Sequence, residues 1–179
     1  MSDEQIAMFS EAAAPITGKP SSFSISKTIN GNAQRVFDHW LIPVFLEKWM
    51  FGTHTGHDKI VSLENTVRRG GDFCYQVSKG QKSTLIQGSY QELDIPSRIS
   101  FTWLEAAEKQ DSGSLDEQAE TCTCTANFEE TDGKTRLKLQ FKVPAALADA
   151  KDAIKSQWTE RCNALSTAFK LIPVVSLSG

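Results

Sequence analysis

The feature that most constrains the fold is one long stretch near the end of the chain, residues 148–172, which contains neither proline nor glycine. Its apolar residues recur at steps of 4, 4, 3, 4 and 3, a spacing that places side chains on one face of an α-helix. These residues are Ile154, Trp158, Cys162, Leu165, Phe169 and Ile172. As a helix, the stretch would be about 37 Å long, enough to cross a whole β-sheet. Pro173 follows where a helix stop is expected.

The chain before this helix consists mainly of short segments with the alternation of a β-strand. Turn signals such as Asn30-Gly31 and Asp132-Gly133 separate several of them. The predicted strands are residues 21–29, 59–65, 72–77, 83–93, 98–104, 120–129 and 135–143. Consecutive hairpins predict an antiparallel sheet.

Two short helices are predicted between the first two strands. Asn32 is a suitable N-cap, and Pro43 suits the first turn of a second helix. The apolar residues of these helices are Val36, Phe37, Trp40, Leu46, Trp49 and Met50. The order of elements therefore predicts an α+β protein, in which a curved seven-stranded antiparallel sheet wraps around a long C-terminal helix. Because such a sheet cannot close tightly around a helix, an internal pocket is expected.

Length and composition restrict the class of protein further. The 179 residues fit one domain, which we place at residues 21–172 between tails at 1–20 and 173–179. A hydrophobic content of 40% and a net charge of -3 argue against a disordered chain and against a dedicated nucleic-acid binder. With an acidic start and no apolar run long enough for a membrane helix, we expect a cytoplasmic protein without a membrane span, either a monomer or a homodimer.

Three segments carry a resemblance to a known family. They are Val36-Phe37-x-x-Trp40-x-x-Pro43-x-x-Leu46-x-x-Trp49, then Arg69-Gly70-Gly71-Asp72-Phe73, then Gly88-x-Tyr90-x-Glu92-Leu93-x-x-Pro96-x-Arg98-Ile99-x-Phe101-Thr102-Trp103. Together they resemble the START-like (helix-grip, SRPBCC) superfamily and, within it, the activator of Hsp90 ATPase homologue 1-like family. The resemblance covers about residues 21–171 and implies a helix-grip fold with a ligand cavity. Further roles implied by it are a co-chaperone-like interaction module and a cyclase or hydrolase acting in the pocket.

Aromatic residues on the predicted strands and helices would surround this cavity. The candidate ligand-binding residues are Trp49, Phe73, Tyr75, Gln87, Phe101, Trp103, Trp158, Arg161, Cys162 and Leu165. For the aromatic residues the alternative is packed core, and for Arg161 it is a surface ion pair with Glu160 or a neighbouring acid. We interpret the chain as a non-enzymatic module that binds a small apolar or amphipathic molecule and needs no cofactor.

Two groups of residues could hold a metal ion. His54, His57 and Asp58 lie close together, but their spacing on a loop favours a solvated segment. Cys122 and Cys124 would share one face of a strand, and Cys162 could face them across the pocket. Without a Cys-x-x-Cys pair, we interpret these three as buried thiols rather than as a metal or redox site.

Residues 105–120 carry six acids and a single base, Lys109. This composition cannot support a core, so it predicts a polar loop that acts as a flexible hairpin end or a lid.

Overall fold

The computed structural model describes residues 19–51, 58–107 and 121–170. Within them, seven strands form one antiparallel sheet in the order β1-β7-β6-β5-β4-β3-β2. The strands are β1 (Ser21–Ile29), β2 (Asp58–Asn65), β3 (Asp72–Lys79), β4 (Lys82–Asp94), β5 (Arg98–Ala107), β6 (Cys122–Thr131) and β7 (Lys134–Val143). The predicted antiparallel sheet is confirmed.

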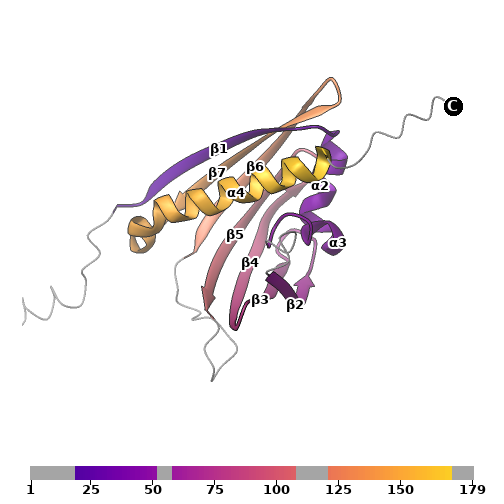
Figure 1. Ribbon diagram of the computed structural model, residues 1–179. Helices are drawn as coiled ribbons and strands as arrows, with labels where there is room; N and C mark the ends of the chain where they lie inside the picture. The colour runs from indigo at the N-terminus through magenta and orange to yellow at the C-terminus, as the bar shows by residue number, and fades with distance from the viewer. Residues whose placement is uncertain (1–18, 52–57, 108–120, 171–179) are drawn as a thin grey trace, which may run out of the picture.

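The two short helices follow β1 as predicted. Asn32 caps α2 (Ala33–Leu41), since its side-chain oxygen accepts a hydrogen bond from the Arg35 backbone N–H at 2.9 Å. Pro43 begins α3 (Pro43–Leu46), where its missing N–H costs nothing. The helices close one end of the curved sheet (Figure 1).

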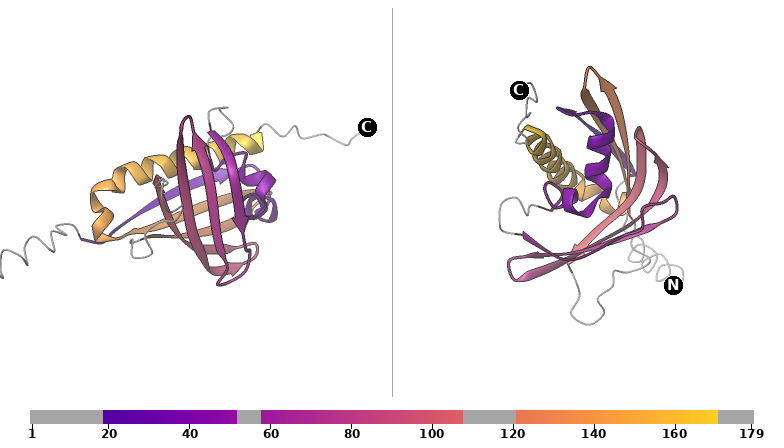
Figure 2. Two further views of the ribbon diagram at one scale, coloured as in Figure 1. Left: turned by 90° about the horizontal axis from the view of Figure 1, so that it is seen from below. Right: turned by 90° about the vertical axis from the view of Figure 1, so that its right-hand side faces the viewer.

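The long helix α4 (Lys151–Lys170) lies across the concave face, and the sheet curves around it (Figure 2). It begins later than the predicted residue 148, because Pro144 leads first into a 3-10 helix, η2 (Ala145–Ala150). Trp158, Leu165 and Phe169 are buried, and Ile154 packs partly buried against the same core. The predicted helix-grip architecture is confirmed. None of the helices in the described ranges is long and apolar enough to span a membrane.

Strand β5 corrects one sequence prediction. The predicted polar loop began at Glu105, but the strand continues to Ala107, and Glu105 pairs with Ile86 of β4. The strand continues because residues 105–107 pair with β4, and the Glu105 carboxylate is neutralised by a partner from α4, a contact described below. The rest of the predicted loop, residues 108–120, lies outside the described residues, as do His54 and His57.

Candidate functional site

Aromatic side chains from two strands and α4 meet on the concave side of the sheet. Phe73 and Tyr75 lie two residues apart on β3, and Phe101 and Trp103 lie two apart on β5, so each pair points to one face. Trp158 meets them from the inner face of α4, with its ring centroid 4.9 Å from that of Trp103 and 6.1 Å from that of Phe101. The Phe73 and Trp103 centroids are 5.8 Å apart. We call these five residues the aromatic wall.

Gly88 permits the close packing of this wall. It pairs with Phe73 across β3 and β4, and a Cβ atom added there would lie 2.3 Å from Phe73 Cζ and 1.9 Å from the Thr102 carbonyl oxygen. Both distances are well inside van der Waals contact, so any larger residue would force the strands or the ring to move. The close approach of Phe73 and Thr102 therefore explains why the third of the family-like segments begins with a glycine, Gly88.

Two further tryptophans extend the wall toward α2. The Trp40 ring stacks 6.2 Å from that of Trp158 and lies 5.9 Å from that of Phe101. Trp49 contacts Trp40 at 4.8 Å and donates a hydrogen bond from Nε1 to the His39 carbonyl oxygen at 2.8 Å. Trp40 was not among the predicted site residues, although the spacing of the first sequence segment already placed it on the same stripe as Phe37.

Arg161 lies at the edge of the aromatic wall and is only 9% exposed. It follows Trp158 by three residues on α4, so both side chains share one helix face. Its guanidinium carbon lies 4.7 Å from the Trp158 ring centroid and 5.1 Å from that of Trp103, an arrangement that favours cation–π attraction. Nε donates a hydrogen bond to the Met50 carbonyl oxygen at 2.9 Å.

The acid that pairs with Arg161 is Glu105, whose Oε2 lies 3.1 Å from Arg161 Nη2. Arg161 therefore forms an ion pair, as the alternative prediction for this residue had it. The partner, however, is an acid on β5 instead of Glu160, and the pair lies in the protein interior instead of on the surface. The side chains are 10% and 18% exposed, respectively. Glu105 could have been predicted from its position two residues after Trp103, because residues two apart on a strand point to the same face.

A second polar group in the interior is a chain of hydrogen bonds that begins at Tyr75. Tyr75 and Tyr90 are hydrogen-bonded to each other, Tyr90 donates to Asn65 Oδ1, and Asn65 Nδ2 donates to the Leu41 carbonyl oxygen at 3.0 Å. Burial raises the pKa of both phenols above the ordinary value of 10, well above it for Tyr75. Both phenols are therefore neutral at neutral pH.

The three cysteines predicted to be buried are buried. Cys122 and Cys124 point inward from β6, and Cys162 lies on the inner face of α4. Burial raises the pKa of Cys162 to about 12 and that of Cys124 well above its usual value. Within the described ranges, no three potential metal ligands come together. Leu165, the last predicted site residue on α4, is fully buried and belongs to the same hydrophobic core.

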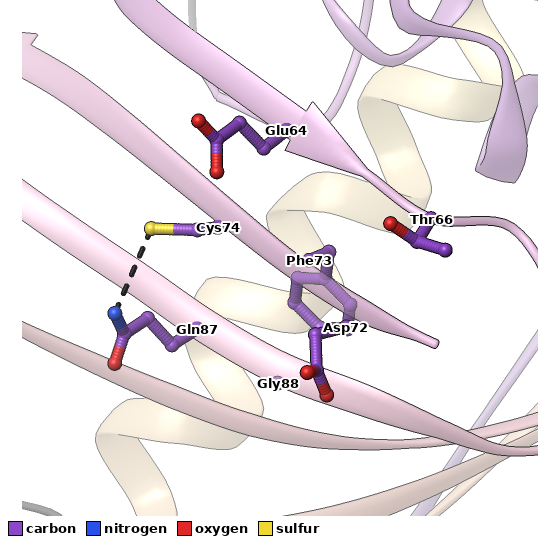
Figure 3. A pocket seen from close by; sticks show the side chains of 7 residues that line it. All are labelled: Glu64, Thr66, Asp72, Phe73, Cys74, Gln87 and Gly88. Atoms are coloured by element: carbon purple, nitrogen blue, oxygen red, sulfur yellow. Dashed lines mark hydrogen bonds between the residues drawn. The ribbon is translucent and has the colours of Figure 1, made fainter. Parts of the chain in front are cut away.

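Gln87 is separated from the other predicted site residues. Its neighbours Ile86 and Gly88 pair with Tyr75 and Phe73, so Gln87 points to the opposite, convex face, where Nε2 lies 3.6 Å from Cys74 Sγ. Figure 3 shows both side chains in front of the sheet, with the helix behind it. They help to form a polar surface pocket of about 370 Å³, lined by Glu64, Thr66, Asp72, Phe73, Cys74, Gln87 and Gly88.

Comparisons with known proteins agree with this fold. A family model described as activator of Hsp90 ATPase homolog 1-like protein matches residues 30–170. The chain is similar to a solved structure from Staphylococcus epidermidis, with TM-score 0.68, 20% identity, and 83% of this chain and 89% of that chain covered. A solved protein from Chromobacterium violaceum has a TM-score of 0.65 and 18% identity, with 84% of this chain and 98% of that chain covered. An AHSA1-like protein from Aeromonas hydrophila has a TM-score of 0.61 and 16% identity, with 83% of this chain and 94% of that chain covered. No curated protein matches the chain significantly.

Proposed function

The chain belongs to the activator of Hsp90 ATPase homolog 1-like family, and from this premise we propose that it is a binding module for a small apolar or amphipathic molecule. The ligand would lie between α4 and the concave face of the sheet. The observation that carries the proposal is the aromatic wall, which ends at the buried guanidinium of Arg161. An apolar surface that ends in one oriented polar group is typical of small-molecule sites.

The driving force for such binding is the removal of apolar ligand surface from water. Each methylene group buried against the wall contributes about 0.8 kcal/mol, so an alkyl chain of moderate length is enough for tight binding. Because the Trp103 and Trp158 rings are in contact, a ligand between α4 and the sheet would displace one of them. Binding would therefore change tryptophan fluorescence.

The chemistry of the interior supports binding more than catalysis. Tyr75, Tyr90, Cys124 and Cys162 all have raised pKa values, so at neutral pH they are neutral groups and not nucleophiles or bases. The free, buried thiols fit the cytoplasmic location that we also propose.

Native mass spectrometry of gently purified protein tests the proposal directly. We expect a bound small molecule that is lost on denaturation and that can be extracted into organic solvent. If the protein carries no ligand and also fails to bind the neutral dye Nile red, the proposed function is wrong.

A second candidate function is interaction with a chaperone, as the description of the family suggests. Ile42 and Val44, which flank the first residue of α3, are 39% and 58% exposed and offer an apolar contact. An increase in Hsp90 ATPase rate that is lost in Val44→Ser would favour this role over ligand binding.

A further inference from the structure

Arg161 carries a hydrogen-bond donor that none of the described residues uses. A guanidinium has five N–H donors, and here Nε binds Met50 and Nη2 binds Glu105. Nη1 is buried, and no residue in the described part of the chain accepts a hydrogen bond from it. Leaving a buried donor unpaired is unfavourable, so an acceptor brought in by a ligand would be bound strongly there.

The other unpaired donor along the aromatic wall is Trp40 Nε1, which is also buried without an acceptor among the described residues. Trp40 stacks on Trp158, and the Arg161 guanidinium also lies near the Trp158 ring. The phenols of Tyr75 and Tyr90, by contrast, are satisfied by each other and by Asn65. The unused hydrogen-bonding capacity of the wall therefore consists of donors, which require an acceptor oxygen.

The charge of this region decides what kind of acceptor fits. Glu105 already neutralises Arg161, and the charged pair is largely shielded from water. A ligand carboxylate would add a second negative charge beside Glu105 in a medium of low dielectric constant, where its lost hydration is not compensated. A carbonyl oxygen would accept the same hydrogen bond without adding charge.

From this geometry, and resting on the proposed function, we infer that the ligand is an uncharged amphipathic molecule whose polar end is the carbonyl of a ketone, ester or amide. The carbonyl oxygen accepts a hydrogen bond from Arg161 Nη1, and the apolar part lies along the aromatic wall. Glu105 is then a specificity-determining residue, because its charge excludes acids of the same chain length.

Competition for Nile red tests the inference. The dye is uncharged, so it introduces no bias of its own, and the competitors are 2-undecanone and undecanoate at pH 8, which have equal chain length. We expect the ketone to displace the dye at a concentration at least about tenfold lower than the acid. In Glu105→Gln, which keeps the shape of the side chain and removes its charge, this preference should fall by at least about tenfold or reverse.

Each result has a definite meaning. Equal or better binding of undecanoate to the unmodified protein overturns the inference and leaves the proposed function standing. An unchanged preference in a folded Glu105→Gln protein also overturns it, since the discrimination would then not come from Glu105. If Nile red and both competitors fail to bind, the proposed function fails together with the inference. The comparison in the unmodified protein decides the matter even if Glu105→Gln does not fold.

Discussion

Glu105 Oε2 lies 3.1 Å from Arg161 Nη2, and this ion pair joins strand β5 to helix α4 across the interior. Another polar contact between the long helix and the sheet, from Lys27 Nζ to Asn163 Oδ1 at 2.8 Å, is exposed. Arg161 also donates to the Met50 carbonyl oxygen, so the same side chain holds the segment after α3. The pair therefore serves both the stability and the proposed specificity of the fold.

Removing one member of this pair should be costly. Glu105→Ala leaves the guanidinium buried without a counter-charge, and we expect a loss of about 3 kcal/mol in the free energy of unfolding, measured by urea denaturation. Arg98→Ala is the matched control, because the Arg98–Glu92 pair is 49% exposed on both sides and should contribute about 0–1 kcal/mol. Equal effects of the two substitutions would contradict the structural role of the buried pair.

Trp158 should be among the residues on which folding depends most. Its side chain is 1% exposed and contacts Trp103, Phe101 and Phe141, so Trp158→Ala is expected to cost about 3–5 kcal/mol in chemical denaturation. Gln157→Ala, one residue earlier on the exposed face of α4, should cost less than about 0.5 kcal/mol. A loss below about 1 kcal/mol for Trp158→Ala would mean that α4 does not pack as described.

Much of the fold could be predicted because local patterns agree with the final packing. The alternation in residues 21–29 appears unchanged in β1, and the helical spacing of Trp158, Leu165 and Phe169 reappears as one buried face. Order along the chain was sufficient for most of the sheet, since each strand from β2 to β6 pairs with the next one along the chain. The exception is β1, which pairs with β7, the last strand.

The site could be predicted only in part, because its key contacts join distant residues. Glu105 was assigned to a loop from the acids around it, and its partner lies 56 residues further along the chain. The direction of Gln87 could not be deduced, since the apolar residues Leu85 and Ile86 are adjacent and give β4 no clear alternation. The direction of the Gln87 side chain follows from the cross-strand pairing of its two neighbours, Gly88 with Phe73 and Ile86 with Tyr75.

Acid should destabilise the protein through His39. The imidazole lies between the Phe45 and Phe169 rings, and its Nδ1 donates to the Arg35 carbonyl oxygen at 2.7 Å, so Nε2 is the site of protonation. Burial lowers the pKa of His39 below the ordinary 6.5. The unfolded chain therefore takes up the proton first, and stability is full above pH 6.5 and falls as the pH drops from there through the folded pKa.

Urea denaturation at pH 7.5 and pH 5.5 would measure this loss. In His39→Phe, which keeps the stacking and cannot be protonated, the difference between the two pH values should be smaller than in the unmodified protein. An identical difference would show that other groups cause the acid sensitivity.

The buried thiols should react slowly with alkylating reagents. Because the pKa of Cys162 is about 12, only about one molecule in 10⁴ carries the thiolate at pH 8. Cys74, half-buried on the convex face, provides the internal comparison and should be labelled first by iodoacetamide. Site-resolved mass spectrometry that found Cys162 or Cys124 labelled as fast as Cys74 would contradict their burial.

Ligand binding should depend on the aromatic wall and not on the convex pocket. Trp103→Ala removes ring surface that the ligand would contact, and a loss of about 60 Å² of apolar contact corresponds to about 1.5 kcal/mol, or roughly tenfold in the Kd for Nile red. Phe73→Ala, in the same wall, should weaken binding in the same direction. Gln87→Ala changes only the convex pocket and should leave the Kd unchanged. If Gln87→Ala weakens binding while Trp103→Ala does not, the dye occupies the convex pocket, and the aromatic wall is not the ligand site.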